Sequence, residues 1–101
     1  MMNKEDLEAI VGTKIRLVRS PWGWPRFGSS PRKLQWENWG KNRRRAEFGT
    51  SIIKSVDVSP VRGRDGWWEV SIAWPGGKWF GVEVEGLESA LSVAEYMAAA
   101  Y

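Results

Sequence analysis

The sequence predicts a single α+β domain over residues 1–101. We expect an antiparallel sheet of three to five strands, with a short N-terminal helix and a C-terminal amphipathic helix packed on one face of the sheet. Two observations predict this fold. Apolar and polar residues alternate along residues 67–74 and 79–85, which is typical of strands. Apolar residues then recur at helical spacing from Leu87 to Tyr101, which predicts the final helix.

The first expected element is a short helix. Asn3 is a favourable N-cap, two acids follow in the first turn, and Gly12 suits the left-handed residue that ends a helix. Two helical turns are not stable alone, so this helix must dock on the rest of the domain. Residues 13–19 predict a strand, with Ile15 and Leu17 on one face.

Residues 20–50 form an irregular, basic segment that is rich in Trp, Pro and Gly. Prolines and glycines between residues 20 and 31 interrupt any regular element. Residues 34–39 are compatible with a strand and residues 41–45 with a basic turn. Four tryptophans argue against disorder, because disordered segments are poor in aromatic residues. A long connection of this kind in a compact domain is usually functional.

A further strand is expected over residues 51–59, followed by a hairpin of residues 67–74 and 79–85. The predicted inward positions of the first of these strands are Ile52, Val56 and Val58. Trp67 and Trp79 fall on the hairpin face away from the final helix. We expect the N-terminal helix or the Trp/Pro segment to cover them; the alternative is that they are exposed, where paired rings on a flat sheet suit a sugar ring, a base or a protein partner.

The hydrophobic pattern restricts the register of this hairpin. A two-residue turn at residues 76–77 would place Ile72 beside Gly81 and put apolar residues on opposite faces. Pairing Ile72 with Val82 keeps the apolar residues of both strands together, and it requires a loop of odd length. We expect the final helix to pack on this apolar face. Ala94 is among the inward residues of the helix, and Trp74 belongs to the apolar face of the hairpin.

The composition excludes most common catalytic chemistry. The chain has no cysteine and no histidine, so disulfides, thiol catalysis, Ser-His-Asp triads and the usual structural zinc sites are ruled out. Glu69, Glu83 and Glu85 share one sheet face and have the chemistry to hold Mg²⁺. Solvated strand faces commonly carry Glu, and no other catalytic set accompanies these acids. We therefore expect no enzymatic activity, no catalytic residue, no metal and no cofactor.

The charges are distributed unevenly along the chain. The formal net charge is +3, but residues 14–64 hold thirteen Lys and Arg against three acids, while both ends of the chain are acidic. A basic middle region indicates a polyanion or an acidic protein as partner.

Aromatic and basic residues alternate between residues 16 and 45, among the eight tryptophans of the chain. Binding of single-stranded nucleic acid uses this combination, because rings stack on bases while cations contact phosphates. The candidate binding residues are Trp22, Trp24, Arg26, Arg32, Lys33, Trp36, Trp39, Lys41, Arg43, Arg44 and Arg45. The structural alternative is that the tryptophans complete a small core on which arginines stack, and that the three consecutive arginines guard a sheet edge.

These observations predict a non-enzymatic protein that binds nucleic acid, with single strands or RNA favoured, or a nucleoprotein complex or other acidic partner. The alternative is a protein–protein interaction module, such as the small inhibitors that phages or mobile elements encode, since Trp and Arg are enriched at interface hot spots. No window has the length of a membrane span and no secretion signal is visible, so a cytoplasmic location without membrane contact is expected. The oligomeric state is left open.

Overall fold

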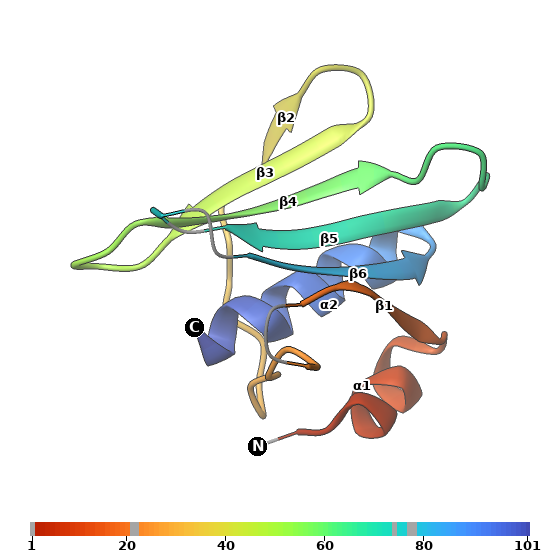
Figure 1. Cartoon of the computed structure of the whole chain (residues 1–101), viewed down its shortest axis with the longest axis horizontal. Helices are drawn as coiled ribbons and strands as arrows, with labels where there is room; N and C mark the ends of the chain where they lie inside the picture. Colours follow the sequence, from red (N-terminus) through yellow and green to blue (C-terminus); the bar gives the residue numbers. More distant parts are fainter. Residues whose placement is uncertain (1, 21–22, 74, 77–78) are drawn as a thin grey trace.

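Six strands form one antiparallel sheet in the computed structural model of the chain (Figure 1), which describes residues 2–20, 23–73, 75–76 and 79–101. The spatial order is β1-β6-β5-β4-β3-β2. The elements are α1 (Lys4–Val11), β1 (Ile15–Arg19), β2 (Glu37–Trp39), β3 (Arg43–Phe48), β4 (Lys54–Pro60), β5 (Trp67–Ala73), β6 (Trp79–Glu85) and α2 (Leu87–Ala100). The predicted α+β class is confirmed, whereas the predicted limit of five strands is wrong.

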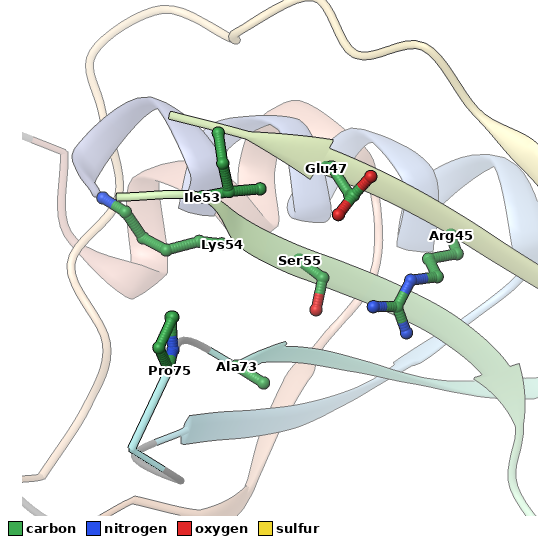
Figure 2. Close-up of a pocket in the computed structure, with 7 residues that line it drawn as sticks. All are labelled: Arg45, Glu47, Ile53, Lys54, Ser55, Ala73 and Pro75. Carbon is green, nitrogen blue, oxygen red and sulfur yellow. The ribbon is translucent and has the colours of Figure 1, made fainter. Parts of the chain in front are cut away.

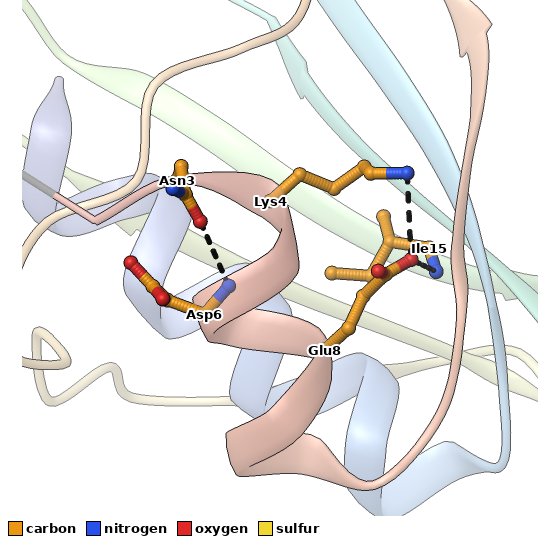
Figure 3. A network of polar contacts seen from close by, with 5 residues as sticks. All are labelled: Asn3, Lys4, Asp6, Glu8 and Ile15. Atoms are coloured by element: carbon orange, nitrogen blue, oxygen red, sulfur yellow. Dashed lines mark hydrogen bonds and ion pairs between the residues drawn. The ribbon is translucent and has the colours of Figure 1, made fainter.

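Helix α1 begins and ends at the predicted residues. The side-chain oxygen of Asn3 accepts a hydrogen bond from the backbone N–H of Asp6 at 2.8 Å (Figure 3). Gly12 has a left-handed φ of 80°, and its N–H donates to the carbonyl of Glu8. These contacts satisfy backbone groups that a helix leaves unpaired at its ends.

Glu8 ties α1 to the edge strand β1. Its carboxylate accepts the backbone N–H of Ile15 at 2.8 Å and lies 3.7 Å from Nζ of Lys4, as Figure 3 shows. Leu7 on the same helix is fully buried. Ser89 Oγ on α2 also donates to the carbonyl of Val11 at 3.1 Å, so the predicted docking of this short helix combines polar contacts with apolar burial.

The hydrophobic core lies between α2 and the sheet. Helix α2 contacts β4, β5 and β6, and both sides of this contact carry fully buried apolar residues. They are Val56, Val58, Val70, Ile72, Val82 and Val84 on the sheet, and Ala90, Val93, Ala94, Met97 and Ala98 on the helix. Full burial of a Val or Ile side chain contributes about 1.5–3 kcal/mol. The predicted packing of the C-terminal helix on this face is confirmed.

The chain crosses from β1, at one edge of the sheet, to β2, at the other edge, and residues 28–32 of this crossover pack against α2. The backbone N–H groups of Gly28 and Arg32 donate to the carbonyls of Tyr96 and Glu95, at 2.8 and 3.0 Å. Phe27 is buried. The crossover therefore lies on the same side of the sheet as α2, and among the described residues no helix covers the opposite side, which we call the open face (Figure 1).

The segment of residues 20–50 contains two strands, so its description as irregular is only partly right. The predicted strand over residues 34–39 is limited to β2. The predicted basic turn over residues 41–45 is wrong from Arg43 onwards, because β3 begins there. Ala46 and Phe48 on β3 are buried beside the core residues of β4, which explains why this segment is extended.

The hairpin of β5 and β6 has a loop with an odd number of residues, as predicted, but its strands pair in a different register. Ile72 pairs with Phe80 and Val70 with Val82, so each pair is shifted by two residues from the predicted one. The loop has odd length and the apolar residues share one face, as expected. The predicted inward position of Trp74 lies outside the described residues.

Strand β4 starts at Lys54, later than predicted. Val56 and Val58 point inward as expected, whereas Ile52 is 55% exposed in the loop between β3 and β4. The inward assignment of Ile52 is therefore wrong, because that position precedes the strand.

Candidate functional site

The predicted binding residues do not gather on one surface. Trp22 lies outside the described residues. Trp24 and Arg26 lie next to the two ends of the chain: Nζ of Lys4 is 5.0 Å from the ring centroid of Trp24, and the guanidinium of Arg26 is 5.6 Å from that of Tyr101. These two residues border a hollow of ≈ 290 Å³ beside α1.

Arg32, Lys33 and Trp36 lie in the crossover. The guanidinium of Arg32 stacks over the ring of the core residue Phe48 at 5.4 Å. Trp36 packs partly against the core, and its buried indole N–H has no hydrogen-bond partner among the described residues. Arg32 and Trp36 thus pack on the core, as the structural alternative predicts, while Lys33 is exposed.

The remaining five candidates come together in the hairpin of β2 and β3. We call this group the hairpin cluster; its members are Trp39, Lys41, Arg43, Arg44 and Arg45. Residues 37–48 hold four cations against two acids. In Figure 1 this hairpin extends beyond the part of the sheet that α2 underlies. The structure therefore brings five of the eleven predicted binding residues together in one hairpin.

Asp57 is the shared ion-pair partner of Arg43 and Arg45 on the open face, and its buried Oδ1 has no hydrogen-bond partner among the described residues. Its Oδ1 lies 3.4 Å from a guanidinium nitrogen of Arg43 and 3.7 Å from one of Arg45. Asp57 is only 8% exposed, whereas the Arg43 side chain is 49% exposed. One carboxylate on β4 is thus shared by two cations on β3, and both guanidiniums keep donors for further contacts.

Trp39 is the exposed ring of the hairpin cluster. The guanidinium of Arg45 lies 4.8 Å from its ring centroid, within the range of a cation–π contact. With Arg45 in place, 49% of Trp39 remains exposed. Trp39 pairs with Arg43 across the hairpin, so two arginines flank the same ring.

The cations are present on both sides of the hairpin. Arg44 pairs with Val58 of β4, whose side chain is in the core, so Arg44 belongs to the helix side, where it is half-buried. Lys41 is exposed in the turn between the strands. The acid opposite Arg45 on β2 is Glu37. The tip of the hairpin is therefore basic on both faces.

Beside the hairpin cluster, the open face has a hollow of ≈ 270 Å³ (Figure 2). Its lining residues are Arg45, Glu47, Ile53, Lys54, Ser55, Ala73 and Pro75. Ser55 and Ala73 are direct partners on β4 and β5. This hollow was not predicted from the sequence, in which the available signal was the small side chains at outward positions of two adjacent strands.

Among the three acids with the chemistry to hold Mg²⁺, Glu83 has an ion-pair partner. Glu69 and Glu83 are opposite each other on β5 and β6, but Glu83 forms a 3.0 Å hydrogen-bonded ion pair with Arg64. Arg64 also stacks on Trp67 at 4.1 Å. Trp67 is thus covered by Arg64 on the open face, and not by the N-terminal helix or the Trp/Pro segment as expected. The side chain of Trp79 is outside the described parts.

No protein-family model, curated protein or solved structure matches the chain. Within the described ranges, no set of three or more acidic side chains is arranged to bind a metal ion. In the same ranges, neither helix combines the length and the apolar character needed to cross a membrane.

Proposed function

We propose that the chain is a non-enzymatic protein that binds single-stranded nucleic acid through the hairpin cluster. One observation carries this proposal: Trp39 remains half-exposed beside Arg43 and Arg45, two cations that share the single carboxylate of Asp57. A stacking ring with cations beside it is the combination that single-strand binding proteins use.

The arrangement supports contacts to bases and to phosphates at once. A base stacks on the exposed surface of Trp39, while Arg43 and Lys41, both exposed, contact the phosphates on either side. Unpaired bases are favoured, because the rings of a duplex are already stacked on each other. The phosphate contacts release counterions, so the affinity should fall steeply as salt increases.

The test is a fluorescence anisotropy titration of a labelled dT oligomer at low and moderate salt. Trp39→Ala should weaken binding about 5- to 150-fold, since a stacked base contributes about 1–3 kcal/mol. The matched control is Trp24→Ala: Trp24 is 42% exposed, close to the value for Trp39, but lies beside α1. Equal binding by the two variants, or affinity that does not depend on salt, would contradict the proposal.

A second candidate function, binding of a protein partner, is favoured by the loop between β3 and β4. Ile52 and Ile53 are adjacent there and are 55% and 48% exposed. Neighbouring exposed apolar residues are typical of interaction surfaces. A double Ile52→Ser, Ile53→Ser variant should lose a protein captured by the wild-type chain from nuclease-treated extract, while it keeps any affinity for dT oligomers.

A further inference from the structure

We propose that the hollow on the open face binds one guanine base of the nucleic-acid strand. This inference rests on the proposed function and adds a base preference to it. The position, the floor and the walls of the hollow each support it.

The position of the hollow makes it continuous with the hairpin cluster. Arg45 lines the hollow and also stacks on Trp39. Arg45 therefore belongs to both places, so that one strand can contact Trp39 and the hollow together. Its five N–H donors allow Arg45 to keep its 3.7 Å ion pair with Asp57 and still donate to a base.

The floor of the hollow suits a flat ring. Ser55 and Ala73 lie side by side on β4 and β5, and neither side chain rises far above the sheet (Figure 2). The volume of ≈ 270 Å³ is below the about 300–1,000 Å³ that is typical of sites for drug-sized ligands. A single base fits this size better than a larger ligand.

The walls of the hollow offer a donor and an acceptor. Arg45 and Glu47 are two residues apart on β3 and on the same face, so their Cα atoms are separated by about 6.5–7 Å. In Figure 2 both side chains border the hollow from the same strand. An arginine pairs best with O6 and N7 of guanine, the commonest specific contact between proteins and bases.

Glu47 is then able to recognise the Watson–Crick edge of the same base. Guanine carries the donors N1–H and N2–H₂ there, and a carboxylate accepts from both. Adenine has no carbonyl to accept the second hydrogen bond of the arginine, and the pyrimidines have no N7. Guanine is therefore the base that can form hydrogen bonds with both Arg45 and Glu47.

The experiment uses four labelled dT hexamers in which one central position is dT, dG, dA or dC. The wild-type chain should bind the dG hexamer at least about fivefold more tightly than the others. Glu47→Gln should lower this ratio, because only the contact of Arg45 then favours guanine, and Ala73→Leu, which fills the floor, should abolish it. Glu47 is exposed and Ala73 faces the open side, and thermal unfolding checks that both variants fold. The ratio of affinities is the readout, because removing an acid raises the affinity for every hexamer.

Glu85→Gln is the matched control, since Glu85 is exposed on β6 and outside the hollow; it should keep the preference for dG. Equal affinity of the wild-type chain for all four hexamers, with binding that still depends on Trp39 and salt, would overturn the guanine site and leave the proposed function standing. A preference for dG that survives in both hollow variants would also overturn the site. Absence of binding to any hexamer would overturn both proposals.

Discussion

Replacement of Asp57 by Asn should lower the stability of the fold and raise its affinity for single-stranded nucleic acid. Asp57 Oδ1 holds guanidinium groups of Arg43 and Arg45 at 3.4 and 3.7 Å. Both arginines are partly exposed, and a partly exposed ion pair contributes about 0.2–1 kcal/mol. Loss of two such pairs removes about 1 kcal/mol, which lowers the Tm of a domain of this size by about 4–8 °C.

The effect on binding has the opposite sign, because the released guanidiniums become available to phosphates. Each additional phosphate contact on a single strand steepens the dependence of log K on log salt by about 0.7. One new contact therefore raises the affinity about fivefold at about 0.1 M salt, and two new contacts raise it about 25-fold. The substitution keeps the shape of the Asp57 side chain, so the hairpin of β2 and β3 is preserved.

Thermal unfolding and anisotropy titrations at several salt concentrations measure the two effects separately. The control is Glu85→Gln, which changes the net charge equally but on β6, three strands from β3. At about 4.8 Å per strand this is roughly 14 Å, beyond the Debye length of about 10 Å at 0.1 M salt. If Asp57→Asn lowers both stability and affinity, the carboxylate positions the arginines for binding instead of competing for them, and this reasoning is refuted.

Two substitution pairs test the fold itself by urea unfolding. Ile72→Ala should cost about 2–5 kcal/mol, because Ile72 is fully buried against α2, whereas Ile52→Ala at the exposed loop should change stability by about 0.5 kcal/mol or less; similar costs would contradict the assigned burial. Gly49→Ala should destabilise far more than Gly12→Ala. Both glycines have positive φ, which costs about 1–2 kcal/mol for alanine, but a Cβ at Gly49 would also meet the carbonyl oxygen of Ile52 at 2.1 Å, while nothing lies within 4 Å at Gly12. Equal effects would mean that the loop after β3 relaxes freely.

Elements with local signals were predictable from the sequence. Capping residues defined α1, and strict alternation or helical spacing defined β5, β6 and α2. Strand β3 was not recognised because its first half carries arginines at successive positions. Arg44 holds an inward position, where it is half-buried beside Val58 although it is charged. Only Ala46 and Phe48 show the alternation, which is too short a pattern to predict a strand.

The hydrophobic pattern also left the register of β5 and β6 partly open. This pattern fixes which residues share a face, and therefore whether the loop has an odd or an even number of residues. Pairing of Ile72 with Val82 and the observed pairing with Phe80 both satisfy this condition. The choice between them depends on the conformation of the loop, which the alternation does not encode.

The candidate site was predictable in residue type but not in extent. Trp24, Trp36 and Trp39 are close in the sequence, yet the crossover carries them from the side of α1, past the core, to the far edge of the sheet. Closeness in sequence predicts closeness in space only within one element or one hairpin. The hairpin of β2 and β3 meets that condition, and its five candidates do come together.

The position of the arginines argues against a role in guarding the sheet edge. Protection of an edge places charged residues on the outermost strand. Here β2 is the outermost strand, and Arg43, Arg44 and Arg45 lie one strand inside, paired with β2 on one side; Arg44 and Arg45 also pair with β4 on the other. Two guanidiniums on the same face share one carboxylate, and Trp39 leaves half of its surface exposed beside them. Neither feature stabilises the fold as well as a second acid or a buried ring would. Under the proposed function, a phosphate would pair with the arginines and a base would stack on the exposed ring.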